Sequence, residues 1–99
     1  MRTLMKVSIP TVAGNKSIKE GILPKTIMQF VEQHKPEGCW FTAQNGQRTA
    51  FFVFDMKNTS DIPAIAEPFF MAFDATIEMS PVMNLEDMKT GVERAMKNV

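Results

Sequence analysis

An Asn-Gly pair between two apolar runs constrains the fold of this chain more than any other feature. Asn45 and Gly46 lie between residues 39–43 and residues 49–54, which are mostly aromatic or aliphatic. A type I′ turn needs positive φ at both of its central residues, and Asn-Gly adopts that conformation readily. The sequence therefore predicts a β-hairpin whose loop residues are Asn45 and Gly46.

Two further strands are predicted from the alternation of apolar and polar residues. Residues 2–10 place Met5, Val7 and Ile9 on one side. Residues 74–82 place Ala75, Ile77 and Met79 on one side in the same way. A period of two is typical of strands with one buried face. Pro81 cannot donate a hydrogen bond within a sheet, so the last strand is predicted to lie at an edge.

Helical spacing predicts a first helix between residues 17 and 35, preceded by a loop at residues 11–15. Leu23, Ile27, Phe30 and Val31 lie on one side of this segment. Pro24 lies inside this segment, and proline suits only the first turn of a helix. We therefore expect a short turn, a break near residues 21–23, and then the main helix with Pro24 near its start.

Two more helices follow the hairpin. Residues 61–72 have helical spacing, with capping oxygens just before them and Pro63 in the first turn. Pro68 lies deeper in this segment and is expected to bend or shorten the helix. Asn84 is expected to cap a final amphipathic helix that carries Leu85 and Val92 on its apolar side.

This order of elements predicts an α+β fold. Two interleaved β-α-β units give the ferredoxin-like βαββαβ arrangement, with an antiparallel sheet in the order 4-1-3-2 and an extra C-terminal helix. The length of 99 residues fits a single domain over residues 1–99.

Charge and composition exclude several classes of protein. Eleven basic residues balance 11 acidic ones without a basic run, so a nucleic-acid partner is not expected. No apolar run has the length of a signal peptide or a membrane span, so we expect a cytoplasmic protein without a membrane partner. The chain has one cysteine and one histidine, so neither a disulfide nor a metal or Cys/His site is expected within one subunit, and no cofactor is expected.

The hairpin register assigns side chains to two faces of the sheet, because residues that face each other across strands share a face. With the predicted loop, Trp40 faces Phe51 and Thr42 faces Thr49. The core face, which the helices are expected to cover, carries Met5, Val7, Ile9, Cys39, Phe41, Ala43, Ala50, Phe52, Phe54, Ala75, Ile77 and Met79. The open face carries Leu4, Lys6, Ser8, Trp40, Thr42, Gln44, Thr49, Phe51, Val53, Thr76, Glu78 and Ser80.

The open face holds too much apolar surface to be left in water. Burying a side chain such as Trp40 or Phe51 is worth about 1.5–3 kcal/mol. A second subunit is the favoured cover, in a symmetric homodimer whose two sheets close into one barrel. The alternative is a monomer in which the last helix folds across its own sheet.

Several short motifs resemble small uncharacterised bacterial members of the dimeric α/β-barrel superfamily. These are Ile9-Pro10, His34-Lys35-Pro36-Glu37-Gly38, Cys39-Trp40-Phe41 and the strand from Phe51 to Asp55. The resemblance implies a ferredoxin-like protomer, a dimer and a small-molecule pocket between sheet and helices. Members of the superfamily include cofactor-free monooxygenases, lactone isomerases, haem-degrading enzymes and ligand-binding regulatory domains. His34 and Trp40 do not match the Asn, Trp and His set of the haem-degrading type, so that activity is not carried over.

Lys6 and Glu78 are the candidate catalytic residues. Both face the open side of neighbouring strands, where a partly desolvated Glu78 would serve as a general base and Lys6 would stabilise a developing oxyanion. The simpler interpretation is a cross-strand salt bridge, which contributes little.

A ligand-binding wall is predicted on the same face. It comprises Trp40, Thr42, Thr49, Phe51 and Ser8, which combine apolar walls with a few polar groups. A dimer interface would use the same residues equally well.

His34 and Cys39 have simpler interpretations. A histidine in the last turn of a helix is favourable there without any chemistry, and a buried thiol behaves as a small apolar group.

We therefore expect a small homodimeric protein that binds a small organic molecule in a pocket on the open face. A catalytic version would be a cofactor-free monooxygenase or isomerase. The alternative is a non-catalytic ligand-binding or dimerisation module.

Overall fold

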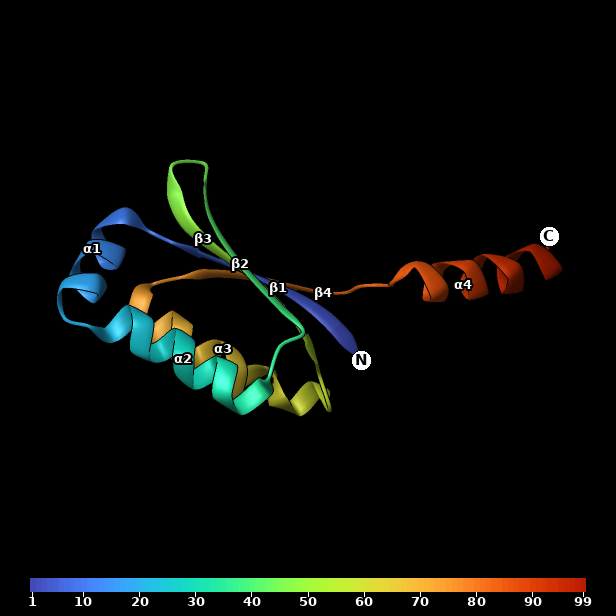
Figure 1. Ribbon diagram of the computed structural model, residues 1–99, viewed down its shortest axis with the longest axis horizontal. Coiled ribbons are helices and arrows are strands. Elements are labelled where there is room, and N and C mark those ends of the chain that lie inside the picture. The colour runs from blue at the N-terminus through green and yellow to red at the C-terminus, as the bar shows by residue number, and fades with distance from the viewer.

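The computed structural model describes residues 1–99, and Figure 1 shows a curved sheet with helices on one side. The elements, in chain order, are β1 (Arg2–Ile9), α1 (Thr11–Lys19), α2 (Ile22–His34), β2 (Gly38–Gln44), β3 (Gln47–Asp55), the 3-10 turn η1 (Thr59–Asp61), α3 (Ile62–Phe73), β4 (Thr76–Pro81) and α4 (Leu85–Lys97).

The sheet has four antiparallel strands in the order β2-β3-β1-β4. Read from the β4 edge, this order is 4-1-3-2, so β1 and β3 are the central strands. Pro81 ends an edge strand, as its missing N–H requires. The α+β class is as predicted, and the arrangement is compatible with a ferredoxin-like fold.

The hairpin turn has the predicted geometry. Asn45 has φ 52° and Gly46 has φ 73°, the positive pair that a type I′ turn needs. Trp40 faces Phe51 and Thr42 faces Thr49 across β2 and β3, so the expected register is confirmed.

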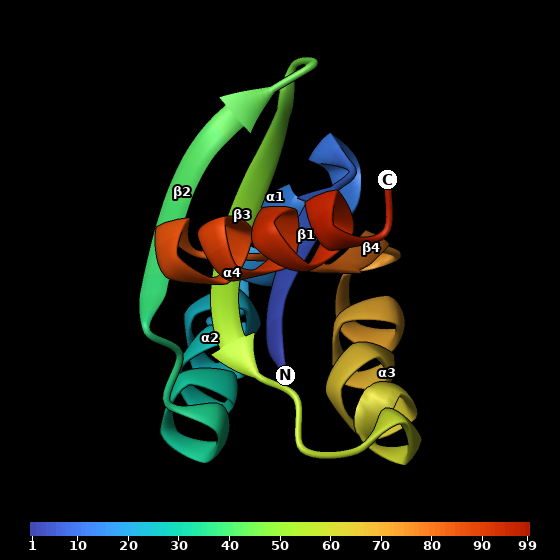
Figure 2. The ribbon, with the colours of Figure 1, turned by 90° about the vertical axis from the view of Figure 1, so that its right-hand side faces the viewer.

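The helices α2 and α3 pack against the core face and bury an aromatic cluster. Seen from the α4 end, α2 lies towards the β2 side of the sheet and α3 towards the β4 side (Figure 2). The Phe30 ring of α2 lies 4.7 Å from the ring of Phe52 and 5.8 Å from that of Phe69. The core residues of the sheet, Met5, Val7, Phe52 and Phe54, have at most 1% of their surface exposed.

The segment expected as a loop at residues 11–15 is helical, and this prediction was wrong. The helix α1 begins at Thr11, directly after Pro10. The sequence suggests Gly14 as a turn residue of that loop, but Gly14 lies inside α1, next to the Arg48 side chain of β3. A Cβ atom on Gly14 would lie 2.7 Å from Nη1 of Arg48 and 3.2 Å from Cγ2 of Ile9. The glycine therefore allows α1 to pack against the sheet.

Two other features define the helices. Gly21 has φ 73° and separates α1 from α2, which is the break expected at residues 21–23. The helix α3 continues through Pro68 to Phe73, so the expected shortening is not observed. Pro68 lies on the exposed side of α3, where water can reach the backbone carbonyl that loses its N–H partner.

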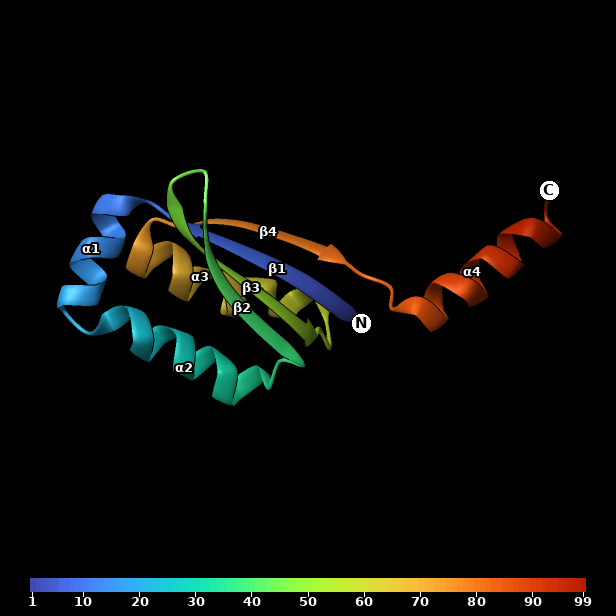
Figure 3. The same cartoon turned by 45° about the horizontal axis from the view of Figure 1, so that its top comes forward.

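The last helix projects away from the rest of the molecule (Figure 1, Figure 3). Every residue of α4 is exposed, so it does not cover its own sheet. The radius of gyration is 15.9 Å, compared with about 13 Å for a compact chain of this length. No helix combines the length and the apolar character needed to cross a membrane.

Candidate functional site

The predicted site residues form two rows across the open face. One row runs Glu78, Lys6, Phe51 and Trp40, and the other runs Thr76, Ser8, Thr49 and Thr42. The sheet therefore brings the candidate catalytic pair next to the candidate aromatic wall.

Lys6 and Glu78 form a loose and hydrated ion pair. Their Nζ and Oε2 atoms are 3.8 Å apart, and 70% of the Glu78 side-chain surface is exposed. An exposed pair of this kind contributes little to stability because water screens it. Most of the Glu78 side chain therefore lies in contact with solvent.

Trp40 lies along its own strand over Gly38. A Cβ atom on Gly38 would lie 2.1 Å from Cη2 of Trp40, so only glycine leaves room for the indole. The residue is nevertheless 58% exposed, and Phe51 beside it is half-buried. The two rings and the neighbouring aliphatic residues Leu4 and Val53 form an apolar patch in contact with solvent.

Thr49 differs from the expectation that its hydroxyl lines an open pocket. Its exposed fraction is 3%, and its hydroxyl donates a hydrogen bond to the carbonyl of Gln47, with 3.1 Å between the oxygens. The one hydrogen-bond donor of the Thr49 side chain is therefore used within the chain. Ser8 and Thr42 flank it and keep more of their surface exposed.

An apolar hollow lies on the helix-covered side of the sheet, between α2 and the hairpin. It has a volume of about 200 Å³ and is bordered by Ile9, Leu23, Ile27, Phe41, Thr42, Arg48, Thr49 and Ala50. We call it the hairpin cavity. Of the predicted ligand-binding residues, only Thr42 and Thr49 border it.

The hairpin cavity is also bordered by residues that the sequence did not suggest for a site, which are Leu23, Ile27, Phe41 and Arg48. One signal was present, because Phe41 faces the small Ala50 across the hairpin and this leaves space beside the ring. Phe41 was expected in the core but is 58% exposed, because α2 diverges from this end of the hairpin.

Arg48 is the one charged residue at the hairpin cavity. Its Nη2 donates a hydrogen bond to Oδ1 of Asn15, at 3.0 Å, and it forms no ion pair. The guanidinium therefore keeps donors that an anion can use.

His34 and Cys39 have structural environments. The His34 ring lies 5.0 Å from the ring of Phe30, in the last turn of α2. It borders a small groove of about 40 Å³ between α2 and α3. Burial raises the pKa of the Cys39 thiol, which favours the neutral form over a nucleophilic thiolate. No group of His, Cys, Asp and Glu side chains is placed to hold a metal ion.

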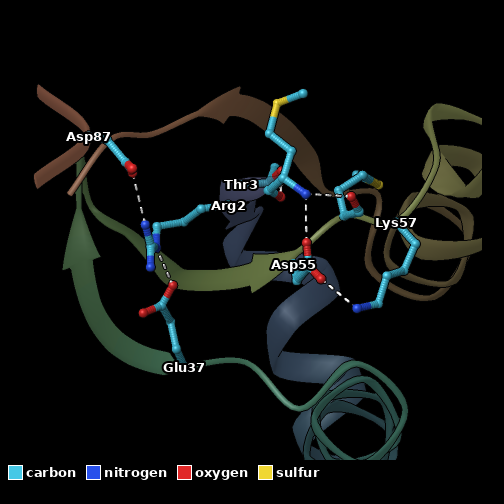
Figure 4. Close-up of polar contacts among 8 residues, drawn as sticks. Arg2, Thr3, Glu37, Asp55, Lys57 and Asp87 are labelled. Carbon is cyan, nitrogen blue, oxygen red and sulfur yellow. Dashed lines mark hydrogen bonds and ion pairs between the residues drawn. The ribbon is translucent and has the colours of Figure 1, made fainter. Parts of the chain in front are cut away.

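A polar cluster connects the start of β1 to segments that are distant in the sequence (Figure 4). Nε of Arg2 donates to Oε1 of Glu37 at 2.6 Å, and Nη1 donates to Oδ2 of Asp87 at 3.1 Å. Asp55 accepts hydrogen bonds from Lys57 and from the amino group of Met1. These two cations, with Lys57 the stronger influence, lower the pKa of Asp55 to about 2.

No protein-family model matches this chain, and no curated protein matches it significantly.

Proposed function

We propose that this chain forms a homodimer that binds a small organic acid, with the hairpin cavity as its binding site. The observation that carries the proposal is an apolar hollow of about 200 Å³ with a single arginine at its border. Binding pockets typically combine apolar walls with a few placed polar groups. The position between sheet and helices is also the one that the resemblance to dimeric α/β barrels implies.

The cavity restricts the chemistry of the ligand. Its volume is below the range of about 300–1,000 Å³ that is usual for drug-sized ligands. The aliphatic and aromatic walls favour a flat apolar body, and Arg48 favours a carboxylate that accepts two parallel hydrogen bonds. A single-ring aromatic acid has both properties.

Binding without catalysis is the version that the geometry favours. Lys6 and Glu78 lie on the open face, and neither is among the residues that border the cavity. A monooxygenase or isomerase that used this pair would need its substrate on the open face.

The dimer is proposed to form through the open face. Leu4, Trp40, Phe51 and Val53 make an apolar patch on it, and an exposed patch of this kind is typical of a subunit interface. The net charge of zero also removes long-range repulsion between copies.

Titration of the ¹⁵N-labelled protein with benzoate and phenylacetate tests the site. We expect saturable amide shifts at Ile27, Phe41 and Arg48, and little response to benzamide, which has the same ring without the charge. Arg48→Met should weaken binding of the acid at least tenfold. Lys19→Met, which removes a cation elsewhere on the surface, is the matched control and should leave binding unchanged.

Two results would contradict this proposal. Saturable shifts confined to Ser8, Trp40 and Phe51 would place the ligand on the open face instead. Equal binding of acid and amide, with no effect of Arg48→Met, would remove Arg48 from the site.

A further inference from the structure

Two apolar surfaces of this chain have no partner within it. The first is the open-face patch, which consists of Leu4, Trp40, Phe51 and Val53. The second is one side of α4, which we call the α4 stripe and which consists of Leu85, Met88, Val92 and Met96. The members of the α4 stripe are between 41% and 62% exposed.

The structure holds α4 away from its own open-face patch. Arg2, the first residue of β1, binds Asp87 in the first turn of α4. The backbone N–H of Val82 donates a hydrogen bond to the carbonyl of Arg2. Asn84 and Asp87 form a reciprocal capping box that fixes where the helix begins. These contacts direct α4 outward from the end of the sheet, as Figure 3 shows.

We propose that the α4 stripe of each subunit packs on the open-face patch of the other. This inference rests on the proposed homodimer and names the element that covers its open face. In a two-fold dimer each such contact occurs twice, once from each helix.

The dimensions of the two surfaces agree. A helix of 13 residues is about 20 Å long. The open-face patch extends over β2, β3 and β1, whose spacing of about 4.8 Å makes it about 10 Å wide. One helix is therefore long enough to cross the whole patch.

The side chains of the two surfaces also suit each other. Met88 and Met96 are flexible, and methionine sulfur makes favourable contacts with aromatic rings such as those of Trp40 and Phe51. The borders of both surfaces carry charges of both signs, with Lys6 and Glu78 beside the patch and Lys89 and Glu93 on α4. Because the charges at each border balance, neither surface repels the other through a net charge of one sign.

The experiment uses the full chain, with light scattering for the mass and isotope-filtered NMR on a mixture of labelled and unlabelled protein. We expect a dimer with intermolecular NOEs from the methyl groups of Met88 and Met96 to the indole of Trp40. Val92→Asp places a charge in the α4 stripe and should raise the dissociation constant of the dimer at least tenfold. Thr90→Asp adds the same charge on the opposite side of α4 and should leave the constant unchanged.

Other outcomes would overturn the inference. A dimer that lacks these NOEs and tolerates Val92→Asp would mean that the two sheets pack directly, which leaves the proposed homodimer intact. NOEs within one chain would mean that α4 folds back on its own sheet. A monomer at all concentrations would remove the homodimer itself, while binding of an acid in the hairpin cavity would still be measurable.

Discussion

Trp40 takes its position because its neighbour on the same face of β2 has no side chain. The indole atoms Cη2 and Cζ3 would lie 2.1 and 2.6 Å from a Cβ atom on Gly38. Because Trp40 also faces Phe51 across the hairpin, the empty position at Gly38 determines the shape of the open-face patch. A glycine that is unremarkable in the sequence therefore sets the surface that a partner would meet.

Substitution of Gly38 tests this dependence. In Gly38→Ala the added methyl group must displace the indole, which is 58% exposed and is free to turn towards solvent. We expect a changed Trp40 emission spectrum of the folded protein, with only a small change in the free energy of unfolding in urea. Gly91→Ala is the control, because a Cβ atom there meets nothing within 4 Å. Unaltered emission from Gly38→Ala would show that the ring does not depend on this space.

The lowered pKa of Asp55 makes the free energy of unfolding depend on pH in the acid range. Its pKa is lowered from 3.8 to about 2 by Lys57 and the Met1 amino group. The folded state therefore binds this proton less readily than the unfolded state, so the stabilisation is present above pH 3.8 and is lost as the pH falls towards 2. In urea titrations over this range, Asp55→Asn should lose less stability than the unmodified protein. Parallel curves for the two proteins would contradict the prediction.

At the scale of elements, α4 depends on its own cap more than on packing. An isolated helix of 13 residues is marginal in water, and removing an N-cap side chain costs about 1 kcal/mol. We therefore expect Asn84→Ala to reduce the helical circular dichroism signal of a dilute, monomeric sample while the unfolding midpoint of the sheet and core changes little. A large fall in that midpoint would mean that α4 packs on its own domain.

Most elements were predictable because local chemistry and tertiary packing agree in them. Asn45-Gly46 determines the turn, the register follows from it, and Asn84 marks the start of α4. The helix α1 was missed because its glycine and polar residues suggest a loop. This helix is stabilised by contacts with residues far away in the sequence. Gly14 lies next to the Arg48 side chain, and the Ser17 hydroxyl lies 3.4 Å from the carbonyl oxygen of Ala72. Such contacts leave no periodic signal near residues 11–15.

The candidate site was predictable only in part, for a similar reason. The pairing of the strands brings Lys6, Glu78, Trp40 and Phe51 together on one face. The alternation of apolar and polar residues along the strands is sufficient to predict this arrangement. The hairpin cavity depends on how far α2 lies from the hairpin, because Leu23 and Ile27 of α2 border it together with residues of the hairpin. No local pattern encodes a distance between two elements.

At the scale of the whole molecule, the two faces of the sheet are proposed to have separate roles. The hairpin cavity and Arg48 lie on the core side, and the open-face patch lies on the other side. Changes on one face should therefore have little effect on the function of the other.

Glu78→Gln tests this separation directly. The substitution removes an exposed ion pair, so we expect the free energy of unfolding to change by less than about 1 kcal/mol. Affinity for an aromatic acid, measured by the same NMR titration, should be unchanged. Loss of acid binding in Glu78→Gln would link the two faces and restore the open face as a candidate site.

The strand order also has a consequence for how the chain is made. Met5 in β1 pairs with Phe52 in β3 and with Met79 in β4, so both of its neighbours are far away in the sequence. On a ribosome, where the N-terminal part emerges first, β1 is complete long before either neighbour exists. The hairpin of β2 and β3 closes locally and needs no such delay. β1 therefore cannot take its place in the sheet until β3 has been synthesised, because neither of its neighbours precedes it in the chain.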